Sequence, residues 1–113
     1  MAYEPLYQSF RAWGPEGQAK DVVFKKAGRL AAGDQPELYF FEVDGLPAVV
    51  GVSGAALHDW QHSRRYLSRE EKIDVAGLFL KQRIEGGEEL VAERLFIQGP
   101  QLEELIRALG LMV

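Results

Sequence analysis

Cysteine is absent from this chain of 113 residues, and histidine occurs only twice. Without a thiol the chain can form neither a disulfide nor a thiolate metal site, and it has no cysteine nucleophile. Long apolar runs are also missing, because no stretch approaches the ~18 apolar residues that a membrane helix requires. The start of the chain carries the acidic Glu4 and no apolar core of a signal peptide. These absences predict a cytoplasmic protein with no membrane partner.

Basic residues are outnumbered, with 13 Lys and Arg against 17 Asp and Glu, which gives a net charge of −4 at pH 7. An acidic chain does not coat nucleic acid or an anionic membrane non-specifically, so nucleic acid is an unfavoured partner. The net charge does not exclude a local basic patch on the surface. The length and the 47% hydrophobic content predict a single domain over residues 1–113 with one modest core.

Residues 37–53 predict a β-hairpin. Two runs rich in aromatic and β-branched residues flank Asp44-Gly45, a pair that tolerates the positive φ angles of a two-residue turn. Pro47 lacks a backbone N–H, and in this register its missing donor points away from the hairpin partner. The second strand should therefore be a sheet edge, at least near its start, and a further strand is expected beside residues 37–43. One face of the hairpin is then apolar and needs a cover. It consists of Tyr39, Phe41, Val43, Leu46, Ala48, Val50 and Val52.

Helices are predicted near residues 54–66, 69–85 and 100–110. Ser53 precedes the first helix as an N-cap, and Ser68 opens a capping box at the second. The third begins with a proline at its first position. The second helix is apolar around most of its circumference, which predicts burial on two sides.

Three segments are harder to assign. For residues 21–32 we favour a helix, because Val23, Phe24 and Ala27 share one face of a helical wheel, although a strand is the open alternative. Residues 1–18 form a peripheral arm or a helix, and there too an alternating pattern allows a strand. Residues 89–98 alternate and predict a strand.

The predicted fold class is therefore α+β with two layers. A small antiparallel sheet, made of the hairpin 37–53 and the strand 89–98, is covered by the helices near 54–66, 69–85 and 100–110.

His58 and His62 are the candidate metal ligands. They lie four residues apart, the spacing by which one helical face offers two nitrogen ligands to zinc. The pentad resembles the zinc-peptidase pattern His-Glu-x-x-His, with Asp59 in place of the glutamate base. The wheel places both histidines beside Arg65 and opposite the buried stripe, so we favour two exposed histidines that bind no metal, and we predict no cofactor.

Arg64, Arg65 and Arg69 form the most basic neighbourhood of the chain. Arginine there predicts contact with an anion, a nucleic-acid backbone or an acidic partner. The alternative, which we favour, is a solvated junction between two helices, where acidic neighbours balance these charges.

Apolar residues exceed what a three-stranded layer can cover, and such a surplus is typical of an interface. The prediction is a homodimer, or a complex with another protein, through one of two surfaces. The candidate interface residues are Leu38, Phe40 and Val49 on the second hairpin face, and Val75, Leu78 and Phe79 on the helix 69–85.

The leading functional interpretation is a non-enzymatic, self-associating interaction or regulatory module. One alternative is a small metal- or anion-dependent enzyme that uses the face of His58, His62 and Arg65. Another is a nucleic-acid-associated regulator that docks through Arg64, Arg65 and Arg69.

Overall fold

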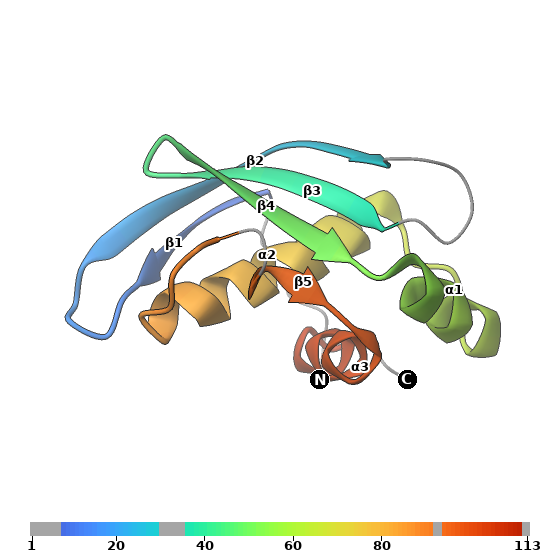
Figure 1. Ribbon diagram of the computed structural model, residues 1–113. Coiled ribbons are helices and arrows are strands. Elements are labelled where there is room, and N and C mark those ends of the chain that lie inside the picture. Colours follow the sequence, from blue (N-terminus) through green and yellow to red (C-terminus); the bar gives the residue numbers. More distant parts are fainter. Residues whose placement is uncertain (1–7, 30–35, 92–93, 112–113) are drawn as a thin grey trace.

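The computed structural model describes residues 8–29, 36–91 and 94–111, and in them the fold is α+β. A curled sheet has the strand order β1-β2-β3-β4-β5, and the helices lie on its concave side, with α2 running along the sheet (Figure 1). No helix in the described ranges is long and apolar enough to cross a membrane. The elements are β1 (Ser9–Trp13), β2 (Ala19–Arg29), β3 (Glu37–Val43), β4 (Leu46–Val52), α1 (Gly54–Ser63), α2 (Arg69–Glu85), β5 (Phe96–Ile97) and α3 (Gly99–Ala108).

The predicted hairpin is confirmed as β3 and β4. Its turn has φ angles of 51° at Asp44 and 82° at Gly45, which favour the Asp-Gly pair found there. The strands pair in the predicted register, with Tyr39 opposite Val50. All the side chains of the predicted apolar face are buried except Leu46, which lies beside the turn and is 70% exposed.

The edge predicted from Pro47 is also confirmed. β2 pairs with β3, so β4 faces outward along most of its length. Only its end is covered, because Gly51 N–H donates to Leu95 O at 2.8 Å and Ser53 N–H donates to Ile97 O at 2.9 Å. Alternation along the ladder then leaves Val49 N–H as the one donor of β4 that points to the open edge.

The helix predicted for residues 21–32 is wrong, because the described part belongs to the strand β2. It pairs with both β1 and β3, and Val22 and Phe24 are buried on the inner face. The register shifts between Phe24 and Lys26. This bulge breaks the alternation of the strand and brings Lys25 and Lys26 to the same side. The apolar and charged residues of this segment therefore follow a two-sided pattern that is also typical of a helix.

The first segment is likewise no helix where it is described. Residues 9–13 form β1, an edge strand in which Ala12 is fully buried and Trp13 is 54% exposed. Residues 1–7 of the predicted arm lie outside the described residues.

The strand predicted over residues 89–98 is much shorter and has the other direction. Among the described residues of this segment, 89–91 and 94–98, only Phe96 and Ile97 form a strand, and it runs parallel to β4. The reason is topological: the chain leaves β4, passes through α1 and α2, and returns on the same side of the sheet, which makes the connection a crossover. The sheet is therefore mixed and has five strands instead of three antiparallel ones.

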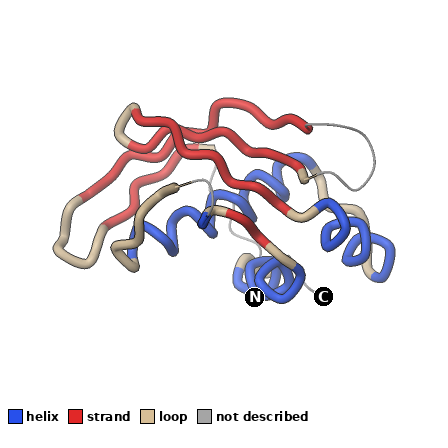
Figure 2. The backbone as a smooth tube through the Cα atoms, viewed as in Figure 1, coloured by secondary structure: helices blue, strands red, loops and turns tan. Residues whose placement is uncertain are grey.

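The N-caps predicted for the first two helices are confirmed, whereas α3 begins at Gly99, so Pro100 is its second residue. Ser53 Oγ accepts from Ala56 N–H at 3.2 Å, and the capping box at Ser68 is complete on both sides. α1 ends at Ser63, three residues earlier than predicted. α2 is buried on two sides, since it contacts the concave face of the sheet and α3 (Figure 2).

Gly51 of β4 leaves room for an aromatic ring. A Cβ added there would lie 2.8 Å from Phe96 Cδ2 and 3.7 Å from Leu38 Cδ2. We expect Gly51→Ala to lower the free energy of unfolding by about 1–2 kcal/mol, because the ring must leave its place on the sheet. Urea unfolding measures this loss. The double variant Gly51→Ala/Phe96→Ala should recover part of it, and a double variant that is less stable by the full sum of both losses would contradict the contact.

Candidate functional site

The two histidines lie on the exposed side of α1. The rings of His58 and His62 are nearly parallel, with centroids 5.9 Å apart and an interplanar angle of 16°. Both side chains are exposed, as the helical wheel predicts. Within the described residues, no group of three or more His, Cys, Asp or Glu side chains is arranged to hold a metal ion. The three-ligand set of the zinc-peptidase pattern is therefore missing from the described part of the chain.

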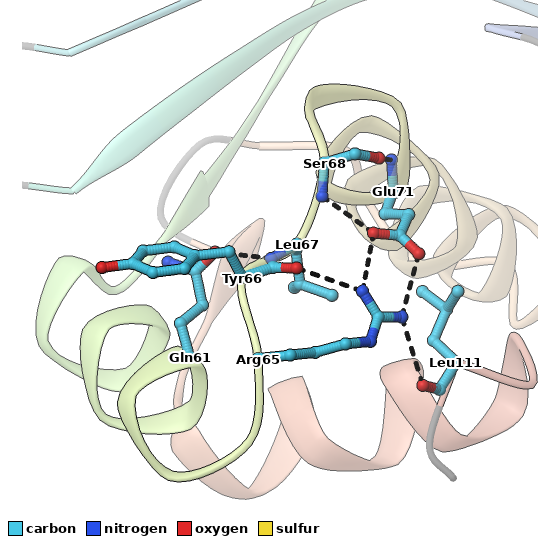
Figure 3. Close-up of polar contacts among 7 residues, drawn as sticks. All are labelled: Gln61, Arg65, Tyr66, Leu67, Ser68, Glu71 and Leu111. Carbon is cyan, nitrogen blue, oxygen red and sulfur yellow. Dashed lines mark hydrogen bonds and ion pairs between the residues drawn. The ribbon is translucent and has the colours of Figure 1, made fainter.

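Arg65 does not lie free beside the histidines. Its Nη1 and Nη2 donate to the two carboxylate oxygens of Glu71, at 3.1 and 3.0 Å (Figure 3). Nη1 also donates to the carbonyl oxygen of Tyr66 at 3.1 Å, and Nη2 to that of Leu111 at 3.4 Å. Arg65 thus ties the α1–α2 connection to the first turn of α2 and to the segment after α3. We call this set of contacts the Arg65 clamp.

The same carboxylate of Glu71 caps α2. Its Oε1 accepts from Ser68 N–H at 2.8 Å. The hydrogen bond from Arg65 is the main cause that lowers the pKa of Glu71, and it prevails over burial, which raises this pKa. In return the bond to Glu71 raises the pKa of Arg65. The charges balance each other, so the clamp is a structural contact and the guanidinium is engaged within the chain.

The other two predicted anion contacts are placed differently. Arg64 is exposed and forms the C-cap of α1. Arg69 lies in the first turn of α2 with its Cζ 5.6 Å from the centroid of the Phe24 ring, a cation–π contact that joins α2 to β2. Of the three arginines, Arg64 is thus the one whose side chain forms no hydrogen bond, ion pair or cation–π contact with the described part of the chain.

The convex side of the sheet, which we call the outer face, carries the uncovered apolar residues. Three of them, Leu38, Phe40 and Val49, are the predicted interface residues of the hairpin, and each is half-buried. Phe96 of β5 lies against Gly51 on the same side and is also half-buried. Because the three described helices lie on the concave side (Figure 2), none of them covers this face.

The other predicted surface is mostly internal. Val75 is 1% exposed and Phe79 is 3% exposed, so the interface expectation for these two residues is corrected. The curled sheet and α3 bury them within the chain. Leu78 is half-buried and packs against the core.

Two lysines of the outer face contact neighbouring side chains. Lys25 Nζ lies 3.9 Å from Glu42 Oε1. Lys26 Nζ lies 5.2 Å from the centroid of the Phe40 ring and covers part of it. The bulge in β2 brings the two lysines to this face. The Lys25–Glu42 pair carries no net charge, whereas the Lys26 ammonium keeps its charge over the ring, so a surface packed here must leave Lys26 Nζ accessible to water.

Sequence reasoning missed two features of the site. Alternation along residues 89–98 puts Phe96 and Ile97 on opposite faces of a strand. No local pattern shows that the Phe96 ring lies on Gly51 of another strand. The pairing of Arg65 with Glu71 spans six residues around a connection. This spacing is not the helical i,i+4 spacing that sequence patterns detect. The one local signal is the negative charge of Glu71 in the capping box of Ser68.

An open cleft of about 420 Å³ lies between the β1–β2 turn and the end of α2. Two of its carboxylates have partners, since Glu88 pairs with Arg83 at 2.8 Å and Glu16 accepts from Gln18 at 3.2 Å. These two carboxylates are therefore engaged by neighbouring side chains of the same chain.

Comparison with known proteins finds no matching family model, no similar curated protein and no similar solved structure.

Proposed function

We propose that this chain is a self-associating interaction module in which the outer face packs against the same face of a second copy. The observation that carries the proposal is the uncovered apolar strip of Leu38, Phe40, Val49 and Phe96 on the side of the sheet that faces away from every described helix. Apolar strips of this kind are typical of protein interfaces.

Two further observations favour a second copy as the partner. The strip is bordered by the Lys25–Glu42 pair and by Lys26, so the face carries both signs of charge and little net charge. A nucleic acid would require an excess of positive charge there. A face that is apolar and nearly neutral fits itself, and the two-fold dimer is the commonest arrangement of soluble assemblies.

The two alternative functions have weaker support. An anion-dependent enzyme or a nucleic-acid-binding regulator would use Arg65, and its guanidinium is engaged by Glu71 and two carbonyl oxygens. Releasing it would cost the contacts of the Arg65 clamp.

Sedimentation equilibrium tests the proposal. We expect the wild-type chain to sediment with twice the mass of one chain at high concentration and to dissociate on dilution. Phe40→Ser and Val49→Ser each remove apolar contact area from the centre of the outer face, and each should weaken the association at least about tenfold.

Tyr66→Ser is the matched control. Tyr66 is 84% exposed and lies on the connection between α1 and α2, outside the strands of the sheet. Its loss should leave the association unchanged. A wild-type chain that stays monomeric at every concentration would refute self-association, and a dimer unaffected by the Phe40 and Val49 variants would refute this face.

A further inference from the structure

Besides the apolar strip of the outer face, the fold leaves the imidazole rings of His58 and His62 on α1 exposed. They are the only two histidines of the chain, and both project from one stripe of the helix with their rings nearly parallel. Each ring carries a nitrogen that is a strong ligand for transition metals when neutral. They belong to α1, which follows β4 at one end of the sheet (Figure 1).

We propose that His58 and His62 together chelate one borderline divalent ion, of the class Cu²⁺, Ni²⁺ or Zn²⁺, with water in the remaining coordination positions. Bonds of about 2.0–2.1 Å to each nitrogen place two neighbouring ligand atoms roughly 3 Å apart. Side chains at i and i+4 begin from Cβ atoms only about 5–6 Å apart, and the exposed rings are free to turn toward one another. Ring rotation alone then converts the stacked pair into two converging ligands.

The Arg65 clamp removes the main objection to a cation at this place. The helical wheel groups Arg65 with the two histidines, and a guanidinium beside them would repel a metal ion. In the structure the guanidinium is held by Glu71 through two charge-assisted hydrogen bonds, at 3.1 and 3.0 Å. Its positive charge is therefore neutralised by a carboxylate that belongs to α2.

The ligand set also defines which ions bind. Two imidazoles favour ions late in the first transition series, with Cu²⁺ the strongest, whereas Mg²⁺ and Ca²⁺ prefer oxygen ligands. The exposed Asp59 between the histidines adds negative charge nearby. The site is a binding site on one helix and does not depend on the self-association proposed above.

Isothermal titration of the full chain with Cu²⁺, in a buffer that does not coordinate metals, tests the proposal. We expect one ion per chain and no heat from Mg²⁺. His58→Ala and His62→Ala should each weaken Cu²⁺ binding about a hundredfold, because the remaining imidazole loses the chelate partner. Both residues are exposed, so the variants keep the fold. Asp59→Asn is the matched control and should change the affinity only a few-fold.

Electron paramagnetic resonance of the Cu²⁺ complex supplies a second readout, in which the wild-type chain should show two coordinated nitrogens and each single variant one. Equal affinity in the wild type and in His62→Ala would overturn the chelate. One ion per two chains, together with a doubled mass, would also overturn it, because the metal would then bridge two copies.

Discussion

Phe41→Ala is expected to lower the free energy of unfolding by about 3–5 kcal/mol. The Phe41 side chain is 2% exposed and meets the Phe24 ring edge to face, with centroids 5.4 Å apart and an interplanar angle of 68°. Its removal leaves a cavity under the centre of the sheet, where β2 and β3 meet the helices. Urea unfolding followed by circular dichroism measures the loss. The m value, which is the slope of the free energy of unfolding against urea concentration, should stay the same if only stability has changed.

Phe40→Ala is the matched control, because it removes a phenylalanine side chain from the residue that precedes Phe41 in β3. Phe40 lies on the outer face and is half-buried, so we expect a loss of only about 1 kcal/mol. The comparison is made on dilute protein, where association does not contribute. Equal losses in the two variants would contradict the assignment of the two faces of the sheet.

Glu71→Ala is expected to have the second largest effect, a loss of about 2–3 kcal/mol. The substitution removes the two hydrogen bonds of the Arg65 clamp that Glu71 accepts, and it removes the acceptor for Ser68 N–H. Because the Arg65 side chain is 42% exposed, solvent screens part of the ionic attraction, and hydrogen bonding supplies most of the effect. Thermal unfolding provides the measurement. Glu70→Ala, an exposed neighbour in the same turn, should cost only about 0.5 kcal/mol, and an equal loss there would contradict the clamp.

The pH dependence of Glu71→Gln isolates the charge of the clamp. The pKa of Glu71 is lower in the folded chain than in the unfolded one, mainly because of Arg65. Its ionic contribution is therefore present above the unfolded pKa, about 4.3, and is lost as the pH falls through the lower folded pKa. The stability gap between wild type and Glu71→Gln should stay constant from neutral pH to about pH 5 and close at more acidic pH. A gap that persists in acid would show that the charge contributes nothing.

The elements predicted correctly are those with a local cause. The Asp44-Gly45 turn, the Ser53 cap and the Ser68 capping box each act within a few residues, so their signals can be read directly from the sequence. The apolar face of the hairpin followed from the same turn, because a two-residue loop determines the register of both strands.

The errors have causes that are distant in sequence. The bulge between Phe24 and Lys26 depends on the pairing of β2 with β3, and without it the alternation of β2 would be visible. The direction of β5 depends on the path of the chain through two helices. The burial of Val75 and Phe79 depends on the curl of a sheet that wraps around α2. None of these features is encoded in a short window of residues.

The two borders of the sheet are unlike, and this limits how copies of the chain can add to one another. Growth of a fibre by strand addition needs two receptive borders on every copy, one for each neighbour. β1 presents alternate backbone groups of Ser9, Arg11 and Trp13 at its border, and no other described strand pairs there. The opposite border is blunted, because Pro47 has no N–H and β5 occupies the end of β4. The border at β4 is therefore a poorer template for an added strand than the border at β1, because Pro47 offers no donor and β5 already pairs with residues 51 and 52.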